Sequence, residues 1–381
     1  MKESRAQMKE SRVDTLIIGG GIIGLSCALE ELRRNKSVCL IDRSSIGKNN
    51  ASWAAAGTMV VRDVKKFFSP LRRMYVQSVQ MMPEWLDFIS KNSQIEIPFI
   101  KGGCYYVYDF GRPEGESEYK ILFSQVNREL ASDYTEMTRP PFLENYLPDT
   151  CKTVYFPNEY YLDNRALLKA IIKTCDNLGL STREEQIEGV EDQGERIKIT
   201  LRNENIYAQH CVITAGAWCG ELLKYFNYAL DIIPVKGQMV TIPKFYDSPA
   251  MVFFHRDLYM VPRQNQLLLG STQERRVWEE GFNDFGEQYL RNTLHKYMAN
   301  VKFEAIQKWA GIRSIIKDRY PVMGFINENK SVIISTAHYK VGFAVAPLCA
   351  TCMSQLIANE EPAFDLSAFN PQREKALYPT S

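Results

Sequence analysis

Three glycines near the N-terminus have the spacing of a dinucleotide-binding turn. Gly19, Gly21 and Gly24 follow the apolar run "VDTLIIGG" and precede a helical pattern. In such a motif the first glycine allows a tight turn, the second lets the backbone approach a pyrophosphate, and the third lets the helix pack against the strand. The helix N-terminus supplies N–H groups and a partial positive charge to the phosphates. The turn therefore predicts bound NAD, NADP or FAD, without choosing among them.

An acidic residue ends the second predicted strand. The segment "SVCLIDR" places Asp42 at the carboxyl end of that strand, followed by Arg43. A carboxylate at this position can accept hydrogen bonds from both hydroxyl groups of a ribose, and it repels a 2′-phosphate. Asp42 therefore argues against NADP.

A loop of small residues beyond Asp42 favours FAD over NAD. The segment "NASWAAAGTM" offers Asn50 and Ser52 as hydrogen-bonding groups among small side chains. A planar isoalloxazine ring can lie flat against such a backbone, whereas an NAD enzyme has no general need of this loop. The later strand "CVITAGAW" also ends in small residues, which again allows close approach of a ligand. An NAD dehydrogenase is therefore the least supported alternative.

A series of short motifs, in the same order and with similar spacing, resembles the D-amino-acid oxidase superfamily of FAD-dependent oxidoreductases. Within it the chain is most similar to the glycine oxidase of thiamine synthesis, with amino-acid dehydrogenases and sarcosine oxidases as neighbours. The resemblance covers residues 13 to 370. Its motifs are "LIIGGGIIG", Asp42, "ASWAAAG", "ITAGAW", "VKGQ", "YMVPR", "WAGIR", "YPVMG" and "AHYKVGFAVAP".

The expected fold is α/β combined with α+β, in two discontinuous domains. A chain of 381 residues exceeds the usual size of one hydrophobic core. Parallel-strand and helix patterns alternate with short antiparallel-looking segments, and the resemblance implies a Rossmann-like FAD-binding domain and a mostly antiparallel substrate-binding domain. We predict the FAD-binding domain at 13–82, 151–222 and 304–381, the substrate-binding domain at 83–150 and 223–303, and a disordered lead at 1–12.

Two helices can be delimited from their residues. One begins near Arg62 and carries "VKKFFSPLRRMYVQSVQ". The other reads "DNRALLKAIIKTCDNLG", with Asp163 or Asn164 as the N-cap and Gly179 as the stop.

The resemblance places the isoalloxazine ring against residues 54–59 and against the loop 338–343. Backbone N–H groups beside Gly342 would there stabilise charge on the reduced ring. Covalent attachment would need a cysteine near Arg313, and none occurs between Cys219 and Cys349, so we expect noncovalent FAD. The expected cofactor-binding residues are Gly19, Gly21, Ile22, Ile23, Gly24, Asp42, Arg43, Asn50, Ser52, Ala54, Ala55, Ala56, Gly57, Met59, Ala215, Gly216, Trp218, Arg313, His338, Tyr339, Lys340, Val341, Gly342 and Phe343.

The resemblance also implies a substrate site. Arg313 in "WAGIRS" matches the family's carboxylate-binding arginine, since a guanidinium pairs bidentately with a carboxylate. Tyr259 in "DLYMVPR" matches a tyrosine that contacts the same carboxylate. The chain departs from glycine oxidase at Lys340 (arginine there), at Gln273 (a methionine over the flavin) and at Asp257 (a histidine). We expect Arg313, Tyr259, Lys340 and Gln273 to form the catalytic set, in a pocket more polar than a glycine site.

The activity implied is oxidative deamination of a small amino acid or secondary amine of the glycine, sarcosine or D-amino-acid class. Hydride passes from the α-carbon to flavin N5, and the resulting imine is hydrolysed, so no side-chain base is required. Oxygen is the expected electron acceptor. The alternatives are a dehydrogenase that reduces a quinone or carrier, supported only by the basic-aromatic "KKFFSPLRRMY", and a flavin-binding accessory subunit without amine turnover.

Composition excludes several other classes of function. Lys plus Arg total 46 and Asp plus Glu total 45, so no nucleic-acid partner is expected. No apolar run is long enough to span a membrane. Nine scattered cysteines favour a reducing cytoplasm over a disulfide framework. The four histidines lack ligand-like spacing, so no metal site is expected, and a homo-oligomer is left open.

Overall fold

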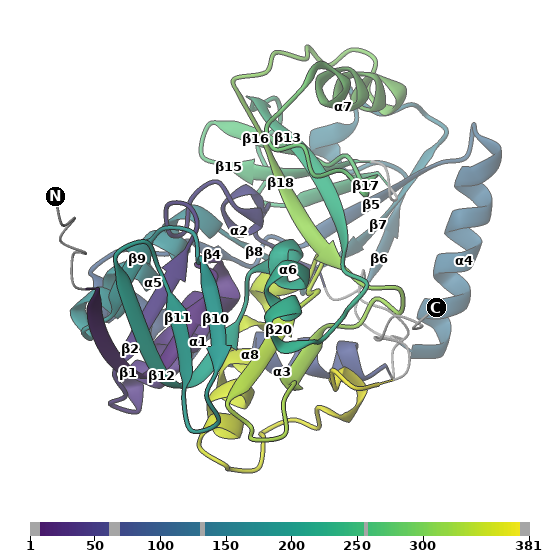
Figure 1. Ribbon diagram of the computed structural model, residues 1–381. Coiled ribbons are helices and arrows are strands. Elements are labelled where there is room, and N and C mark those ends of the chain that lie inside the picture. Colours follow the sequence, from purple (N-terminus) through teal and green to yellow (C-terminus); the bar gives the residue numbers. More distant parts are fainter. Residues whose placement is uncertain (1–7, 61–68, 130–133, 255–257, 374–381) are drawn as a thin grey trace, which may run out of the picture.

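The computed structural model describes residues 8–60, 69–129, 134–254 and 258–373, with the backbone alone for 122–129. Two large sheets form the body of the molecule, and a small three-stranded sheet joins them (Figure 1). Each large sheet has its own helices and its own hydrophobic clusters. The mixed fold expected from the sequence is confirmed.

The first sheet has eight strands in the order β10-β11-β12-β1-β2-β9, with β20 beside β12 and β19 beside β20. Its centre is parallel: β20, β12, β1, β2 and β9 run in the same direction. The strands are β1 (Lys9–Ile18), β2 (Val38–Asp42), β9 (Ser181–Glu184), β10 (Gly189–Asp192), β11 (Ile197–Thr200), β12 (Glu204–Ile213), β19 (Val322–Phe325) and β20 (Val332–Thr336).

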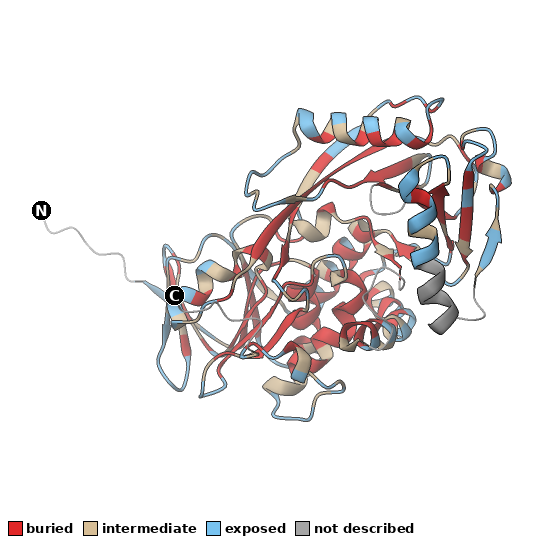
Figure 2. Ribbon diagram, turned by 90° about the vertical axis from the view of Figure 1, so that its right-hand side faces the viewer, coloured by how far each residue is buried: buried red, intermediate tan, exposed pale blue. Residues whose placement is uncertain are grey.

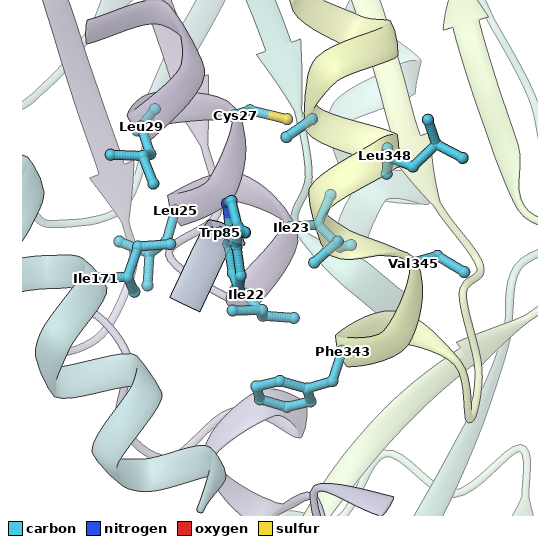
Figure 3. Packing of buried hydrophobic residues seen from close by; sticks show 14 of the residues in the cluster. Ile22, Ile23, Leu25, Cys27, Leu29, Trp85, Ile171, Phe343, Val345 and Leu348 are labelled. Atoms are coloured by element: carbon cyan, nitrogen blue, oxygen red, sulfur yellow. The ribbon is translucent and has the colours of Figure 1, made fainter. Parts of the chain in front are cut away.

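On one face of this sheet α1 (Ile22–Arg33) packs between α5 (Asn164–Asn177) and α8 (Gly342–Ile357), and α3 (Pro70–Ser93) packs on α5 and α8. Successive strand residues point to opposite faces. Ile17 therefore packs with the helices, whereas Leu16 and Ile18 pack in the cluster on the other face. Figure 3 shows apolar side chains of α1, such as Ile23, next to helix α8.

The second sheet has nine strands in the order β17-β13-β16-β15-β14-β5-β7-β6, with β18 also paired to β13. All neighbours are antiparallel except β14 and β5. The strands are β5 (Cys104–Asp109), β6 (Thr135–Met137), β7 (Cys151–Phe156), β13 (Ile233–Pro243), β14 (Met251–Phe254), β15 (Leu258–Arg263), β16 (Gln266–Gly270), β17 (Glu274–Arg275) and β18 (Gln307–Ile315).

Helix α7 (Asp284–Tyr297) covers the outer face of the second sheet, and Figure 2 shows its buried residues turned toward the strands. The small sheet consists of β3 (Thr58–Met59), β8 (Tyr160–Leu162) and β4 (Phe99–Ile100). The remaining elements are α2 (Ala51–Ala54), α4 (Pro113–Glu129), α6 (Cys219–Leu223), and the 3-10 turns Pro141–Leu143, Gly216–Trp218, Lys224–Phe226 and Ser367–Phe369.

The structure corrects the predicted boundaries at four places. The boundary between 82 and 83 falls inside α3, a single helix that packs with the helices of the first sheet. Strands β7 and β18 belong to the nine-stranded sheet, although the boundaries at 151 and 304 gave them to the FAD-binding domain. The predicted lead is wrong for Lys9 to Arg12, which extend β1 along Glu204 to Tyr207 of β12. Strand pairing uses backbone groups, so these polar residues pair without an apolar pattern. Residues 1–7 lie outside the described part of the chain.

The predicted helix near Arg62 begins later than expected. Helix α3 starts at Pro70, and the Oγ of Ser69 accepts a hydrogen bond from the Arg72 N–H at 3.3 Å. Serine followed by proline is a strong helix start. The serine side chain caps the first turn, and the N–H that proline lacks would have no acceptor within the helix at that position. The stretch 61–68 is outside the described residues.

The start of α5 is as predicted, since the carboxylate of Asp163 accepts the N–H groups of Arg165 and Ala166.

Candidate active site

A cavity of about 720 Å³ runs between the two large sheets. It begins at the carboxyl ends of β1 and β2 and reaches the inner face of the nine-stranded sheet. Most of the predicted cofactor-binding residues line it: Gly19, Gly21, Ile22, Ile23, Asp42, Arg43, Asn50, Ser52, Ala55, Ala56, Gly57, Ala215, Gly216, Trp218, Arg313, His338, Tyr339, Lys340, Val341, Gly342 and Phe343. The fold therefore brings together segments that are far apart in the sequence.

Three predicted residues do not reach the cavity wall. The side chains of Ala54 and Met59 are turned into the core, where each residue is 1% exposed. Gly24 lies under the glycine turn, and a Cβ at this position would stand 1.9 Å from the carbonyl oxygen of Gly19. Gly24 thus allows the helix to pack closely on the turn.

The first turn of α1 faces the cavity, and no negatively charged side chain of that turn balances the partial positive charge of the helix N-terminus. The helix follows Gly21, which provides no side-chain cap, and no acidic residue lies in the first turn. The Oγ of Ser52 accepts the N–H of Ile22 at 2.9 Å. Around Gly21 there is open space, since the only heavy atom within 4 Å of a Cβ built there is the Ser52 Oγ. These features fit the pyrophosphate of a dinucleotide.

The carboxylate of Asp42 is already partly used by the protein. Its Oδ2 accepts the N–H of Gly20 at 2.7 Å, and its Oδ1 accepts the N–H and the hydroxyl of Ser44 at 2.9 and 3.0 Å. A carboxylate has about four acceptor positions. The remaining one, on Oδ2, can accept one ribose hydroxyl, whereas the sequence had suggested two.

The small-residue loop after Asn50 is held in place by side chains that the sequence analysis missed. The indole N–H of Trp309 donates to the carbonyl of Ala54 at 3.0 Å. The amide of Asn164 donates to the carbonyls of Ser52 and Trp53 at 3.0 and 3.1 Å. No sequence signal marks these partners, because each contact joins positions more than a hundred residues apart.

Two arginines complete the support of this loop. Arg263 of β15 donates through Nη2 to the carbonyl of Ala56, and burial lowers the pKa of its guanidinium. Arg165 of α5 lies over the rings of Trp53 and Trp309, at 3.8 and 4.6 Å from their centroids. The loop predicted to meet the isoalloxazine is therefore a rigid surface, fixed from both sheets.

Arg313 lies on β18 at the second-sheet end of the cavity. Its Nη2 donates to the Oγ of Ser271 at 2.6 Å, whereas its Nη1 is buried and has no hydrogen-bond partner among the described residues. The neighbouring strand provides room at Gly237, where a Cβ would lie 2.1 Å from Nη2. A buried guanidinium nitrogen without an acceptor is costly unless a ligand supplies one.

Tyr259 lines the same end of the cavity. Its hydroxyl lies 3.5 Å from the Sδ of Met239. Burial raises the pKa of the Tyr259 hydroxyl, and the nearby Arg313 only partly offsets this effect. The hydroxyl therefore stays protonated at neutral pH and can donate a hydrogen bond to an anionic ligand.

The other two predicted catalytic residues lie at the rim. Lys340 is exposed on the cavity wall, with its Nζ 5.5 Å from the ring centroid of Tyr339. Gln273 is exposed and does not line the cavity, because its amide oxygen instead accepts the hydroxyl of Tyr339 at 2.8 Å. The catalytic role of Gln273 therefore stays a prediction. Asp257 lies outside the described residues.

The structure adds wall residues that the sequence analysis did not name. Their types are common in any core, and only the fold directs them to the cavity. Near the nine-stranded sheet these are Val60, Tyr75, Met239, Phe253, Ser271 and Ile312, and beyond β9 and around α6 they are Glu185, Gln186, Ile187, Leu222, Lys224 and Tyr225. Among the described residues, no three His, Cys, Asp or Glu side chains form a group that could hold a metal ion.

Comparison with known proteins decides the family. Residues 14–356 match the DAO family, described as FAD dependent oxidoreductase. The chain belongs to this family. The predicted cofactor is therefore confirmed as FAD, and the cavity has the glycine turn, helix end and small-residue loop that this dinucleotide needs.

None of the helices in the described ranges is long and apolar enough to cross a membrane.

Individual members of the family are distant in sequence and close in fold. The chain is 24% identical to a glycine oxidase of Geobacillus kaustophilus, over 95% of this chain and 97% of that protein. It is 27% identical to a bifunctional protein ThiO/ThiG of Synechocystis, over 94% of this chain and 54% of that protein. The crystal structure of a glycine oxidase from Geobacillus kaustophilus superposes with a TM-score of 0.87 at 23% identity, covering 95% of this chain and 99% of that one.

His338 is a buried histidine on the wall of the cavity, and its burial predicts a specific pH dependence of the protein's stability. Its ring nitrogen lies 3.4 Å from the Oγ of Ser335 and 3.6 Å from the Sγ of Cys349. Burial lowers the pKa of His338 to about 3. The unfolded chain therefore binds a proton near pH 6.5 that the folded chain does not bind, so this group costs stability as the pH falls below 6.5.

We expect His338→Asn to remove this loss. Between pH 7 and pH 5 the histidine lowers the free energy of unfolding by about 2 kcal/mol, from the difference between its two pKa values. Urea unfolding of the wild type and the variant at both pH values measures the effect. Between pH 7 and pH 5 the free energy of unfolding of the wild type should fall by about 2 kcal/mol more than that of the variant. A difference that does not change with pH would contradict the prediction.

Proposed function

We propose that the chain catalyses the FAD-dependent oxidative deamination of a small amino acid or secondary amine that carries a carboxylate, with oxygen as the acceptor. The observation that carries this proposal is the Nη1 of Arg313, which has no partner in the described part of the chain and lies on the wall of a cavity that also opens on the glycine turn. Such a nitrogen calls for an anionic partner, and a carboxylate can bridge it and the hydroxyl of Tyr259.

The similar proteins support an amine as the reacting group. Glycine oxidases are among the relatives, and the structure of an iminodiacetate oxidase from Chelativorans superposes with a TM-score of 0.82 at 18% identity, over 94% of this chain and 98% of that one. All these proteins are named for the oxidation of amines that also carry carboxylates. Arg313 is the group in this chain that would hold such a carboxylate.

The protein's own contribution to the reaction is orientation and exclusion of water. FAD, when bound, supplies the hydride acceptor. Arg313 and Tyr259 would hold the carboxylate of the substrate. The α-carbon of the substrate would then point toward the small-residue loop, which Trp309 and Arg263 hold in place. The apolar wall of Val60, Met239 and Phe253 would keep water from the reacting carbon and favour an unprotonated amine. The exposed Lys340 adds a second positive charge at the rim.

The experiment is an anaerobic absorption spectrum of the purified holoprotein during addition of glycine, sarcosine, D-alanine and D-proline in turn. We expect at least one amine to bleach the oxidised flavin bands. Readmission of air should then restore the colour within seconds, because oxygen is the proposed acceptor. If colour returns only when a quinone is added, the chain is a dehydrogenase. If no carboxylated amine bleaches the flavin, the proposed activity is wrong and a flavin-binding accessory role becomes the better explanation.

A further inference from the structure

A surface segment of the second sheet reaches across to the first sheet beside the FAD site. The segment, residues 276–283, connects β17 to α7. Three consecutive residues in it, Trp278, Glu279 and Glu280, each contact a different side chain outside the segment. Two of these contacts, those of Trp278 and Glu280, reach side chains that follow strands of the first sheet.

The segment is anchored to its own sheet on β13. The carboxylate of Glu279 lies 3.3 Å from the Nζ of Lys236, a lysine whose side chain is fully buried. At the end of the segment the backbone N–H of Asn283 donates to the Oε1 of Gln238 at 2.8 Å, and the Nε2 of Gln238 donates to the Oδ1 of Asn283, also at 2.8 Å. A carboxylate and an amide held by buried partners give the segment a fixed path.

From this anchor the segment reaches two side chains on the wall of the cavity. The ring of Trp278 lies 5.7 Å from the ring of Trp218, centroid to centroid. Glu280 forms an ion pair with Arg43, whose guanidinium stands 4.0 Å over the Trp218 ring. Arg43 and Trp218 both line the cavity, and Arg43 directly follows Asp42 at the end of β2. The contacts thus converge on the end of the cavity that the adenosine of a dinucleotide would occupy.

We propose that the 276–283 segment is a strap that retains the adenosine half of FAD. Trp278 and Glu280 are positioning residues: they hold Trp218 and Arg43 in place before the cofactor arrives, so less conformational freedom is lost on binding. The isoalloxazine loop has its own supports in Trp309, Asn164 and Arg263. Loss of the strap should therefore weaken the hold on adenosine and leave the flavin end as it was.

The test compares the dissociation constants of FAD and FMN for the apoprotein, measured by quenching of flavin fluorescence. The double variant Trp278→Ala/Glu280→Gln should bind FAD about tenfold more weakly, since it loses an aromatic contact and an ion pair that both support the adenosine end. FMN has no adenosine, so its dissociation constant should stay the same. The matched control is Phe285→Ala, which removes an aromatic side chain of similar exposure, 53% against 47%, that contacts neither Arg43 nor Trp218.

A thermal unfolding curve of each apoprotein separates a strap from a general structural role. The proposal requires that the double variant bind FAD more weakly while the melting temperature of its apoprotein changes by no more than that of the Phe285→Ala control. Unchanged FAD affinity in the double variant would overturn it. So would an equal loss of FAD and FMN affinity, or a melting temperature that falls well below that of the control, because the segment would then act on the whole fold.

Discussion

Replacing Arg313 by methionine is expected to lower kcat/KM for a carboxylated amine by about a thousandfold, which corresponds to about 4 kcal/mol. The guanidinium has one nitrogen that donates to Ser271 and one that is buried without a partner in the described ranges, so the proposed function gives the second nitrogen a substrate carboxylate as acceptor. Methionine fills a similar volume but supplies neither charge nor donor. Anaerobic stopped-flow reduction of the flavin, with the amine that reduces the wild type, measures the loss.

Two comparisons show whether the carboxylate carries the effect. Arg313→Lys keeps the charge and loses the planar fork, so its rate constant should fall between those of the wild type and Arg313→Met. The decarboxylated analogue of the substrate should react equally slowly with all three proteins, because it has no group for the guanidinium to bind. If Arg313→Met slows the analogue as much as the substrate, Arg313 does not act on a carboxylate and the proposed function loses its main support.

Gly24→Ala is expected to destabilise the protein by about 3 kcal/mol and to abolish FAD retention during purification. The new Cβ would stand 1.9 Å from the carbonyl oxygen of Gly19 and 2.6 Å from the Oγ1 of Thr214. Thr214 already donates to the carbonyls of Ile18 and Gly19 at 3.0 Å, so the turn has no room to yield. The helix must shift, and the helix end that faces the phosphates shifts with it. Urea unfolding and the flavin-to-protein absorbance ratio measure both effects.

Gly220→Ala is the matched control for this change. A Cβ at Gly220 would meet nothing within 4 Å, and the residue lies in helix α6 with an ordinary backbone conformation. Alanine favours a helix over glycine by about 0.5–1 kcal/mol, so the control should be as stable as the wild type or slightly more stable. A Gly24→Ala variant that keeps its FAD and its unfolding midpoint would show that the turn tolerates a side chain.

The sequence by itself determined the parts of this protein that depend on local pattern. The glycine turn is written in consecutive residues, because its steric demands act on the backbone over a few positions. The N-cap of α5 at Asp163 is equally local, since the side chain bonds the next turn of the same helix. The cofactor and the family followed from several such motifs in a fixed order. The family match over residues 14–356 confirms both.

The predictions that failed concern contacts between distant segments of the chain. The domain boundaries failed at β18, which looks like any apolar strand and whose partner, β13, is fixed only by the pairing of the folded sheet. The start of the chain failed for a similar reason, because Lys9 to Arg12 are held by the backbone of β12 and show no apolar pattern. The role of Gln273 stays a prediction from motif position, while the direction of its side chain depends on the distant hydroxyl of Tyr339.

Only the tertiary structure decided which residues work together at the site. The supports of the small-residue loop and the contacts of the 276–283 segment with Arg43 and Trp218 join positions separated by tens to hundreds of residues. Each depends on a distance of a few ångströms between side chains from different elements. Local propensity carries no information about such distances, since a buried tryptophan or arginine has the same sequence signature whether it supports a cofactor loop or fills a core.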